Sequence, residues 1–598
     1  MDGQRREDKI QAQTNSRTVA ALPANEISPR ESAPKMIKGL RYFAAIGLAL
    51  LIVAGFGLRL YRPAADPPSW LYVYNTDEGH YSYNAYNKTK TGHWFVDEAK
   101  YALITPLFSL AQYLVAGGLP EQPNIVRYRA ISILSGILFC LALRYLFGPP
   151  FIGWTAAALG SVSFMGVVHS RVGIPEMMLT LLLLVTALLA IAGEKRRSFI
   201  LTMATGFTAV ACAAIKLTGA LMLPIVIVAP LLCRALGRRS NTYFAGIAAG
   251  ALLGVSAVSL IVVVPYYADW LSWVSLVTSV GRGAVAPDLA GLLASLFSFL
   301  LSPALQTMPI LWPMALCWCI CVFLPRLKNG ENDFEETLIF LWLGFGIVLL
   351  GLPSYQPARW QLMIFPPVIA AGFRFLLQVR RFTAVAAALA LAVTLSATFS
   401  GMIGGGVLRL SGEIYPGEGM LSHIVTFAVA ASAFSLAVVA ARIFRMGWRT
   451  GVLAGVVLLE LSVQFMLHAA YMKPAYSRET QWAACAGALE RLKRSDNDLF
   501  AGSMVQDLSL RADIRVLPTY YVLEKDQLDD RSVRDFFLRQ NQRPDYFLLL
   551  DLERSLWTQK APLFMESLEA IGRCRLLIGD LGIRELHVYR VSSYDWLS

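Results

Sequence analysis

Charged side chains are scarce in this chain. Only 16% of its 598 residues are Asp, Glu, Lys or Arg, whereas 56% are hydrophobic, and the mean hydropathy is +0.51. Soluble domains carry about 25% charged residues, so this composition excludes a soluble protein. Runs of about 18 or more apolar residues predict membrane-spanning helices, because about 20 helical residues cross the hydrocarbon core of a bilayer.

About thirteen such runs are present, and the fold class that we predict is an all-α polytopic membrane protein. No short apolar segment with a small-residue cleavage site precedes the first run, which we therefore expect to be an uncleaved anchor. The polar segment 1–36 before it is expected to be a disordered cytoplasmic tail. The predicted spans are approximately 39–60, 127–147, 150–168, 176–193, 198–215, 217–233, 243–265, 303–324, 337–352, 361–378, 382–401, 423–441 and 451–469.

The basic residues do not form the single patch that nucleic acid requires, although the formal net charge is +12. They cluster in alternate connections between the predicted spans, which is the positive-inside pattern. This pattern places the N-terminus in the cytoplasm and, after thirteen spans, the C-terminus outside the plasma (inner) membrane. The clusters are Arg5, Arg6, Lys9, Arg17, Arg30, Lys35 and Lys38; Lys195, Arg196 and Arg197; Arg234, Arg238 and Arg239; Arg326 and Lys328; Arg380 and Arg381; and Arg442, Arg445 and Arg449.

Cysteine is also infrequent, with eight residues, and no tight ligand spacing of the kind found in metal sites is present. We predict no cofactor firmly, and a divalent metal held by His80, His93 or His169 stays an alternative. Cys485 and Cys574 lie in the exported tail, where an oxidising compartment permits a disulfide, and the sequence leaves open whether they pair. The other six lie in or at the edge of predicted spans: Cys140, Cys212, Cys233, Cys317, Cys319 and Cys321.

Two further regions follow the N-terminal tail. Residues 37–469 form the predicted transmembrane domain, and its first external loop, 61–126, is long. Within this loop the apolar stretch 101–118 is predicted to be an interfacial helix, because a proline, a glutamine and two terminal glycines weaken it as a span. Residues 470–598 are charged and contain short alternating segments, which predict an extracytoplasmic α/β domain.

The most informative stretch is LYVYNTDEGHYSYNAYN, residues 71–87, which carries the adjacent carboxylates Asp77 and Glu78. Two acids held together at a membrane surface can serve as a general base, a metal ligand or a cation grip. They can equally cap a following helix, and such a cap would also fix a carboxylate in place. The tyrosines of this stretch favour a membrane interface, and from it we predict His80 and Tyr83 as substrate contacts.

Three cations stand out on the external side, against the positive-inside trend. Arg171 lies in HSRVGIPE together with Glu176, Lys216 lies in AAIKLTGALMLP, and Arg359 lies in PSYQPARW. Ionisable residues at membrane depth are costly and are functional candidates by default. A single cation at a helix end can also be a snorkelling anchor, and Arg171 can simply pair with Glu176.

These side chains suit group transfer from a lipid-linked anionic donor. Arg and Lys can hold a phosphate and stabilise its growing charge as it leaves. A fixed Asp can take the proton of an acceptor hydroxyl. The sequence has no glycine-rich nucleotide cradle, so it does not support a nucleotide-sugar donor.

The stretches TDEGHYSYNAYN, HSRVGIPE, AIKLTGALMLP and PARWQLMIFPP together resemble the polyprenyl-phosphate-sugar-dependent glycosyltransferases of the GT-C fold. Within these, the protein O-mannosyltransferase and aminoarabinose (lipid A) transferase group is the most similar, over roughly residues 39–380. The resemblance implies a GT-C-like membrane enzyme that transfers a monosaccharide from a polyprenyl-phosphate donor, with inversion. The acceptor, a protein, glycolipid or polysaccharide, would lie at the outer face of the membrane.

The resemblance also implies roles for particular residues. Asp77 would be the general base with Glu78 beside it in the site. Arg171, Lys216 and Arg359 would contact the donor phosphate, and Glu176 would be an acidic substrate contact. Trp360 stands where relatives often carry Tyr, and the C-terminal region resembles no known module, so the acceptor class stays open.

Other functions have different requirements. A transporter or flippase for lipid-linked glycans would need charged residues along a path to the cytoplasmic side and internal repeats, and the sequence has neither. A non-catalytic assembly subunit would leave Asp77 dispensable. A polymerase or oligosaccharyltransferase would transfer a whole glycan and would need a larger cavity.

Overall fold

The computed structural model describes residues 35–65, 75–121, 123–233, 240–283, 288–300, 308, 310–353, 358–378, 448–469, 481–519, 528–577 and 583–597. The chain divides into two units, Met1–Leu48 and Ala49–Ser598, and every contact given below lies within the second. Two predicted spans, 382–401 and 423–441, lie outside the described residues.

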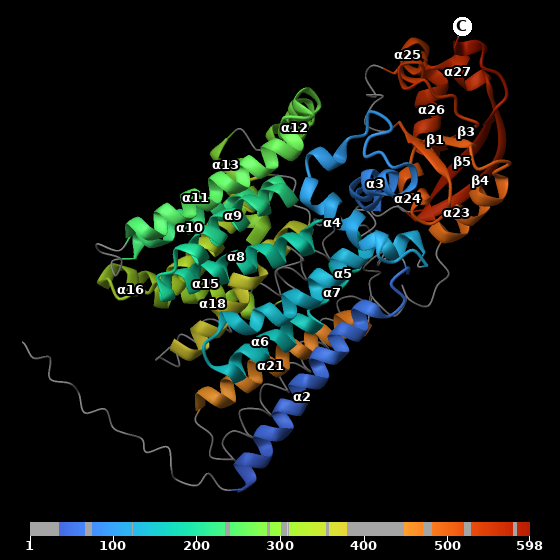
Figure 1. Cartoon of the computed structure of the whole chain (residues 1–598). Coiled ribbons are helices and arrows are strands. Elements are labelled where there is room, and N and C mark those ends of the chain that lie inside the picture. Colours follow the sequence, from blue (N-terminus) through green and yellow to red (C-terminus); the bar gives the residue numbers. More distant parts are fainter. Residues whose placement is uncertain are drawn as a thin grey trace, which may run out of the picture. The chain divides into compact units, whose positions relative to one another are not determined.

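Most of the described chain is helical (Figure 1). Short 3-10 or π segments join or extend several helices: η2 Tyr101–Leu103, η3 Arg144–Leu146, η4 Leu217–Leu221, η6 Ser259–Val263, η7 Cys319–Phe323 and η8 Ala358–Ile364. The α-helices before the C-terminal region are α2 Lys35–Leu60, α3 Asn75–Thr91, α4 Pro106–Gly117, α5 Asn124–Leu143, α6 Pro150–Val162, α7 Phe164–Ser170, α8 Glu176–Arg196, α9 Phe199–Ile215, α10 Met222–Leu232, α11 Ser240–Val258, α12 Tyr267–Gly283, α13 Leu289–Leu300, α15 Leu311–Trp318, α16 Leu324–Asn329, α17 Phe334–Gly351, α18 Phe365–Gln378 and α21 Trp448–Leu467.

Seven helices in the described part of the chain are long and apolar enough to cross a membrane, and α6 with α7, bent by 58° at one break, make an eighth. Shorter apolar helices occupy the predicted spans 198–215, 217–233 and 451–469. Each predicted span among the described residues therefore coincides with an apolar helix, and the polytopic all-α class is confirmed. Helix α4 has 12 residues, too few to cross a bilayer core, and its position along the membrane surface stays a prediction.

The break between α6 and α7 leaves backbone groups that a membrane-spanning segment must satisfy internally. Distant side chains meet this need. The Gln464 Oε1 atom accepts the Phe164 N–H at 2.7 Å, and the His468 Nε2 atom lies 2.9 Å from the Val162 carbonyl oxygen. The buried Arg59 guanidinium donates to the Ser161 carbonyl oxygen. Polar residues of two other predicted spans, 39–60 and 451–469, thus hold the bent one in place.

The C-terminal region contains a five-stranded mixed sheet with the strand order β2-β1-β3-β5-β4 (Figure 1). Strand β1 pairs in parallel with β2 and β3, whereas β5 pairs antiparallel with β3 and β4. The predicted α/β character of this region is therefore confirmed. Its elements are α23 Gln481–Leu492, β1 Leu499–Gly502, α24 Val505–Ser509, β2 Arg515–Pro518, α25 Asp530–Gln540, β3 Tyr546–Leu550, α26 Asp551–Lys560, α27 Pro562–Glu566, β4 Leu568–Leu577 and β5 Ile583–Val591.

Both faces of this sheet are buried, as expected for a central strand such as β3 in which every residue is apolar. On one face, α25, α26 and α27 contribute Phe536, Trp557 and Phe564 to a core with Phe547. The core on the other face contains side chains of α23 and α24. It also contains three side chains from the first external loop: Tyr83, Ala99 and Tyr101. The first external loop therefore supplies part of one layer of the C-terminal core.

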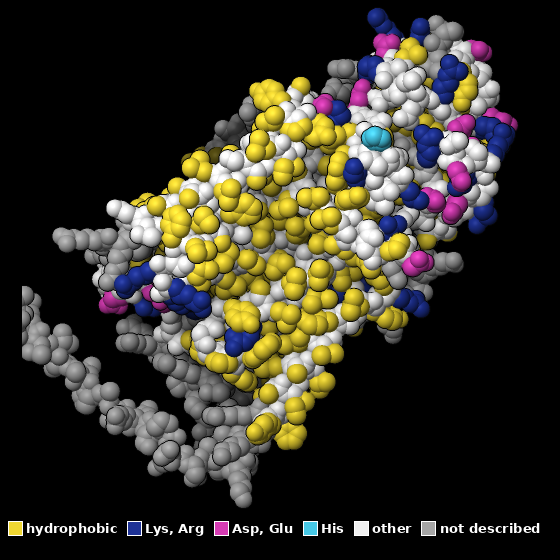
Figure 2. Space-filling view, viewed as in Figure 1, with side chains coloured by type: hydrophobic (Ala, Val, Ile, Leu, Met, Phe, Trp, Pro, Cys, Tyr) yellow, Lys and Arg dark blue, Asp and Glu magenta, His cyan; other side chains and the backbone are white. Residues whose placement is uncertain are grey.

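The helical bundle and the C-terminal region differ in the side chains that they expose. In Figure 2, hydrophobic side chains cover most of the visible face of the helical bundle, while Lys, Arg, Asp and Glu are frequent over the C-terminal sheet region. Exposed residues of the bundle include Leu252, Leu260 and Ile261, which are each more than two-thirds accessible. Such an apolar surface suits a lipid environment.

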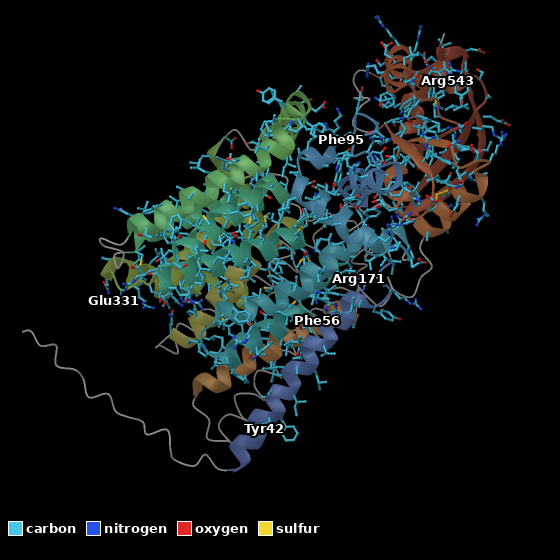
Figure 3. All side chains as sticks on the ribbon, viewed as in Figure 1. Tyr42, Phe56, Phe95, Arg171, Glu331 and Arg543 are labelled. Carbon is cyan, nitrogen blue, oxygen red and sulfur yellow. A yellow bond between two sulfur atoms is a disulfide. The ribbon has the colours of Figure 1, made fainter. Side chains whose placement is uncertain are left out.

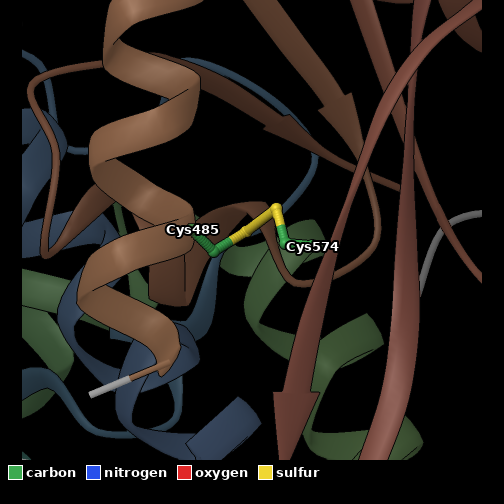
Figure 4. The surroundings of a disulfide bond; sticks show 2 residues. All are labelled: Cys485 and Cys574. Atoms are coloured by element: carbon green, nitrogen blue, oxygen red, sulfur yellow. A yellow bond between two sulfur atoms is a disulfide. The ribbon is translucent and has the colours of Figure 1, made fainter. Parts of the chain in front are cut away.

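A disulfide joins Cys485 of α23 to Cys574 of β4, with a Cα–Cα distance of 5.6 Å and a sequence separation of 89 (Figure 4). This answers the question that the sequence left open. The bond fastens α23 against the antiparallel edge of the sheet. The other six cysteines are free thiols.

Removal of the disulfide is expected to destabilise the C-terminal domain. Closing a loop of this length contributes about 4.6 kcal/mol by chain entropy, so Cys485→Ser should unfold at a clearly lower denaturant concentration than wild type. Alkylation of the denatured, unreduced chain should modify six thiols, and reduction should raise the number to eight, because two of the eight cysteines are paired. Eight modified thiols without reductant would contradict the pairing.

Candidate active site

Helix α3, Asn75–Thr91, carries the acidic motif in its first turn. A carboxylate at this place is favoured, because the amides of the first helical turn carry a partial positive charge. Because the helix begins at Asn75, Asp77 is its third residue and not its N-cap, so the capping interpretation of Asp77 is wrong, while Glu78 lies in the first turn as that interpretation expected. The side chains of Asp77 and Glu78 have separate sets of partners, described below.

Asp77 belongs to a cluster of two acids and two cations. The Arg359 Nη2 atom lies 2.6 Å from the Asp77 Oδ2 atom, and the Arg359 Nε atom donates to the Glu176 Oε1 atom at 3.0 Å. The Lys216 Nζ atom donates to the same Glu176 oxygen at 2.5 Å. Four residues from four separate predicted external segments therefore meet within ion-pairing distance, as the sequence predicted for acids and cations at this boundary.

The elements around the cluster explain how these side chains are held. Glu176 begins α8, where the helix dipole favours a negative charge. Lys216 lies between α9 and η4 and has an extended backbone. Its side chain therefore does not follow the direction of the side chains of α9. That ammonium lies 5.5 Å from the centre of the Tyr81 ring and 5.8 Å from that of Trp360, and such rings attract a cation.

The cluster is not uniformly buried. The Asp77 side chain is 22% exposed, whereas those of Arg359 and Glu176 are 5% and 0% exposed. Burial raises the pKa of Asp77, while the nearby Arg359 and Lys216 charges oppose that rise. Asp77 is therefore the more accessible of the two acids in this cluster.

Glu78 has a different environment, because its side chain is buried and both of its carboxylate oxygens accept hydrogen bonds from Arg129. Arg129 of α5 donates to both carboxylate oxygens, at 2.6 and 2.8 Å, and the Gly173 amide donates to one of them at 2.7 Å. Although burial opposes ionisation, these donors and Arg511 bring the pKa of Glu78 below its usual value. A buried carboxylate with a bidentate guanidinium is a strong structural pair.

The guanidinium of Arg171 donates to three backbone carbonyl groups just beyond the end of α2 and in its last turn. The Arg171 Nη1 atom donates to the oxygens of Leu58 and Tyr61 at 2.5 and 2.6 Å, and the Nη2 atom donates to Arg62 at 2.7 Å. Figure 3 marks Arg171. The Leu58 carbonyl is one of the last four of α2, which a helix end leaves without intrahelical partners. The phosphate contact expected for Arg171 stays a prediction.

His80 and Tyr83 lie further along α3 and face the first external loop and the C-terminal domain. The His80 ring stacks on Tyr101 with 4.8 Å between ring centres, and burial lowers the pKa of His80 to about 3. The Tyr83 hydroxyl hydrogen-bonds to the Asp97 carboxylate and lies 3.0 Å from the Val516 carbonyl oxygen. The substrate contacts expected for His80 and Tyr83 stay predictions.

Sequence reasoning missed three charged residues next to the motif. Arg129 is a cation near the start of a predicted span. Placing a charge in the membrane costs free energy, so this position by itself indicates a buried partner of opposite charge. Asp507 and Arg511 belong to the C-terminal domain, and nothing local in the sequence links them to Asp77 or Glu78. Within the described part of the chain, no group of three or more His, Cys, Asp or Glu side chains is arranged to hold a metal ion.

The fold is shared with a known protein. No family model and no curated protein sequence matches the chain. The crystal structure of ArnT from Cupriavidus metallidurans in the apo state matches 91% of this chain and 98% of that chain, with a TM-score of 0.52 and 17% identity. ArnT bound to undecaprenyl phosphate matches 94% and 99%, with a TM-score of 0.52 and 16% identity. The chain therefore has an ArnT-like GT-C fold over most of its length, as the resemblance implied.

The Glu78–Arg129 pair is expected to stabilise the fold. Glu78→Ala would leave the Arg129 guanidinium buried without its counter-charge, which typically costs about 3–5 kcal/mol. Thermal unfolding in lipid nanodiscs should show a lower midpoint for this variant than for wild type.

The matched control for this change is Asp77→Ala, because the Asp77 side chain is partly exposed and its partner Arg359 keeps Glu176 as a counter-charge. Equal unfolding midpoints for the two variants would contradict the difference between the two carboxylates.

Proposed function

We propose that this protein is an inverting glycosyltransferase that moves one sugar from a polyprenyl-phosphate donor to an acceptor at the outer face of the membrane. The observation that carries the proposal is the cluster of Asp77, Glu176, Lys216 and Arg359. It lies in a protein whose fold is that of ArnT, which has been crystallised with undecaprenyl phosphate. Charge pattern and fold together favour a membrane-embedded anion as the ligand.

Arg359 and Lys216 are the proposed phosphate contacts. In the structure their charges are balanced by Asp77 and Glu176, and a phosphate would compete with these carboxylates for the same cations. Arg can hold such a group through two parallel hydrogen bonds, while Lys acts as a point charge. Glu176 would then keep both cations in position from within the protein, since its side chain is fully buried.

Asp77 is the proposed general base. It is the partly exposed carboxylate of the cluster, so an acceptor hydroxyl can approach it. Donor binding would draw the positive charge of Arg359 toward the phosphate. The attraction that limits the rise in the pKa of Asp77 caused by burial would weaken, and Asp77 would become a stronger base.

The reaction is a single displacement. The acceptor oxygen forms a bond to the anomeric carbon of the sugar as the bond between that carbon and the phosphate oxygen breaks. The proton of the acceptor hydroxyl moves to Asp77, and the electron pair of the broken bond leaves with the polyprenyl phosphate. Lys216 and Arg359 stabilise the charge that develops on the leaving group.

The proposed orientation follows from the basic clusters of the sequence, which put the N-terminus in the cytoplasm and the C-terminal domain outside the plasma (inner) membrane. The site would then open to the extracytoplasmic side, where lipid-linked sugars and not nucleotide sugars supply the donor. The disulfide of the C-terminal domain supports an oxidising compartment on that side.

Asp77→Asn is expected to retain donor binding but to transfer sugar at least about a hundredfold more slowly, since general-base catalysis contributes that much or more. The assay uses purified protein in nanodiscs and a panel of polyprenyl-phosphate monosaccharides, with release of free polyprenyl phosphate as the readout. If wild type binds no such donor, the glycosyltransferase proposal fails and transport or assembly becomes the better account.

Lys216→Ala and Arg359→Ala are expected to weaken donor binding by about tenfold or more each, because charge-assisted hydrogen bonds contribute about 1.5–3 kcal/mol. Lys195→Ala is the matched control, since its ammonium also pairs with a glutamate but is 60% exposed and lies outside the cluster. Unchanged donor affinity in both cluster variants would remove the phosphate assignment.

A further inference from the structure

The C-terminal domain reaches the acidic motif directly. The Gly79 amide, one residue after Asp77-Glu78, donates to the Asp507 Oδ1 atom at 2.9 Å. Asp507 belongs to α24, which lies 428 residues further along the chain. Asp507 is only 1% exposed, so this hydrogen bond is shielded from water.

Helices α3 and α24 approach each other so closely that only glycine fits at position 79 of α3. A Cβ atom added to Gly79 would lie 2.7 Å from both the Cγ and the backbone N of Asp507. No side chain larger than hydrogen fits there unless α24 moves away. Helix α3 and α24 are thus in backbone-level contact beside the proposed base.

Arg511 makes a second connection at the same place. Its Nη1 atom donates to the Asp507 carbonyl oxygen at 2.9 Å, and its Nη2 atom lies 3.8 Å from the Glu78 Oε2 atom. Glu78 therefore lies between Arg129 of the bundle and Arg511 of the C-terminal domain. Burial raises the pKa of Asp507 well above its usual value, and Glu78 adds to the rise against the opposing charge of Arg511. A neutral Asp507 still offers an oxygen to the Gly79 amide.

Further contacts extend along the same helix. The Tyr86 hydroxyl donates to the Ile514 carbonyl oxygen at 3.3 Å, and the Lys90 Nζ atom pairs with Asp513 at 2.5 Å. Leu510 packs in a core with Ala85 and Tyr86. Helix α3 is a polar helix outside the predicted spans, and this series of contacts fixes it along its length.

We propose that α24 completes the active site, with Asp507 and Arg511 as positioning residues that hold the first turn of α3, and hence Asp77, in its working place. This inference rests on the proposed glycosyl transfer for its kinetic consequence. A small misplacement of a reacting group can cost about a hundredfold in rate. The C-terminal domain would therefore act on the rate of the chemical step while leaving the phosphate cations Lys216 and Arg359 untouched.

The test compares Asp507→Ala with Asp507→Asn in nanodiscs. The alanine variant loses the acceptor for the Gly79 amide and should transfer sugar at least tenfold more slowly, with donor affinity within about twofold of wild type. The asparagine variant keeps a side-chain oxygen at that place and should recover most of the lost rate. A full rate in the alanine variant, or a rate that asparagine does not recover, would overturn the proposal.

Hydrogen exchange in residues 75–91 provides a readout that does not depend on sugar transfer. Exchange of the first turn of α3 should be faster than wild type in Asp507→Ala and close to wild type in Asp507→Asn. If wild type transfers no sugar, this comparison alone decides whether Asp507 holds the helix, and equal exchange in the two variants would refute it. The proposed function and the positioning role can thus fail separately.

A glycine pair supplies the matched control. Gly79→Ala should slow transfer as Asp507→Ala does, because its new methyl group would displace α24. Gly117→Ala should leave the rate unchanged, since nothing lies within 4 Å of a Cβ atom there. Equal rates in the two glycine variants would contradict the close approach as the source of the effect.

Discussion

The arrangement of this protein depends on one electrostatic requirement: carboxylates buried inside the protein need cations beside them. Glu78 meets it with Arg129, and Glu176 meets it with Lys216 and Arg359. These pairs join α3, α5 and α8 with the segments that carry Lys216 and Arg359. Asp77 shares Arg359 with Glu176 and is partly exposed, which is why we propose it as the member of the set that meets a ligand.

The same requirement explains why the adjacent acids of the motif differ. Glu78 receives two bonds from one guanidinium and one from a backbone amide, so its oxygens are occupied by the scaffold. Asp77 has one close cation and a route to solvent. Neighbouring carboxylates of similar chemistry thus acquire separate tasks, one in holding the fold and one in the proposed reaction. The C-terminal domain contributes to both, since Arg511 approaches Glu78 and Asp507 binds the next amide.

Much of the membrane architecture could be predicted from the sequence, because each span is encoded locally by its own apolar run. The cluster of Asp77, Glu176, Lys216 and Arg359 was also accessible, since a charge at membrane depth is conspicuous where most residues are apolar. The partners of Glu78 could not be predicted from the sequence. Arg511 is an ordinary arginine of a charged region, and its position follows from packing of the sheet against the first external loop, which no short sequence pattern reports. The Cys485–Cys574 pairing was open for the same reason.

The central claim is that Arg359 and Lys216 hold a lipid-linked phosphate beside Asp77. The most direct measurement is a cryo-electron microscopy structure of the full chain in nanodiscs with bound polyprenyl phosphate. The account predicts the phosphate within hydrogen-bonding distance of both cations, with the Asp77–Arg359 contact lengthened from 2.6 Å and Glu78 still paired with Arg129. A phosphate bound elsewhere, with the cluster of four residues unchanged, would contradict the account.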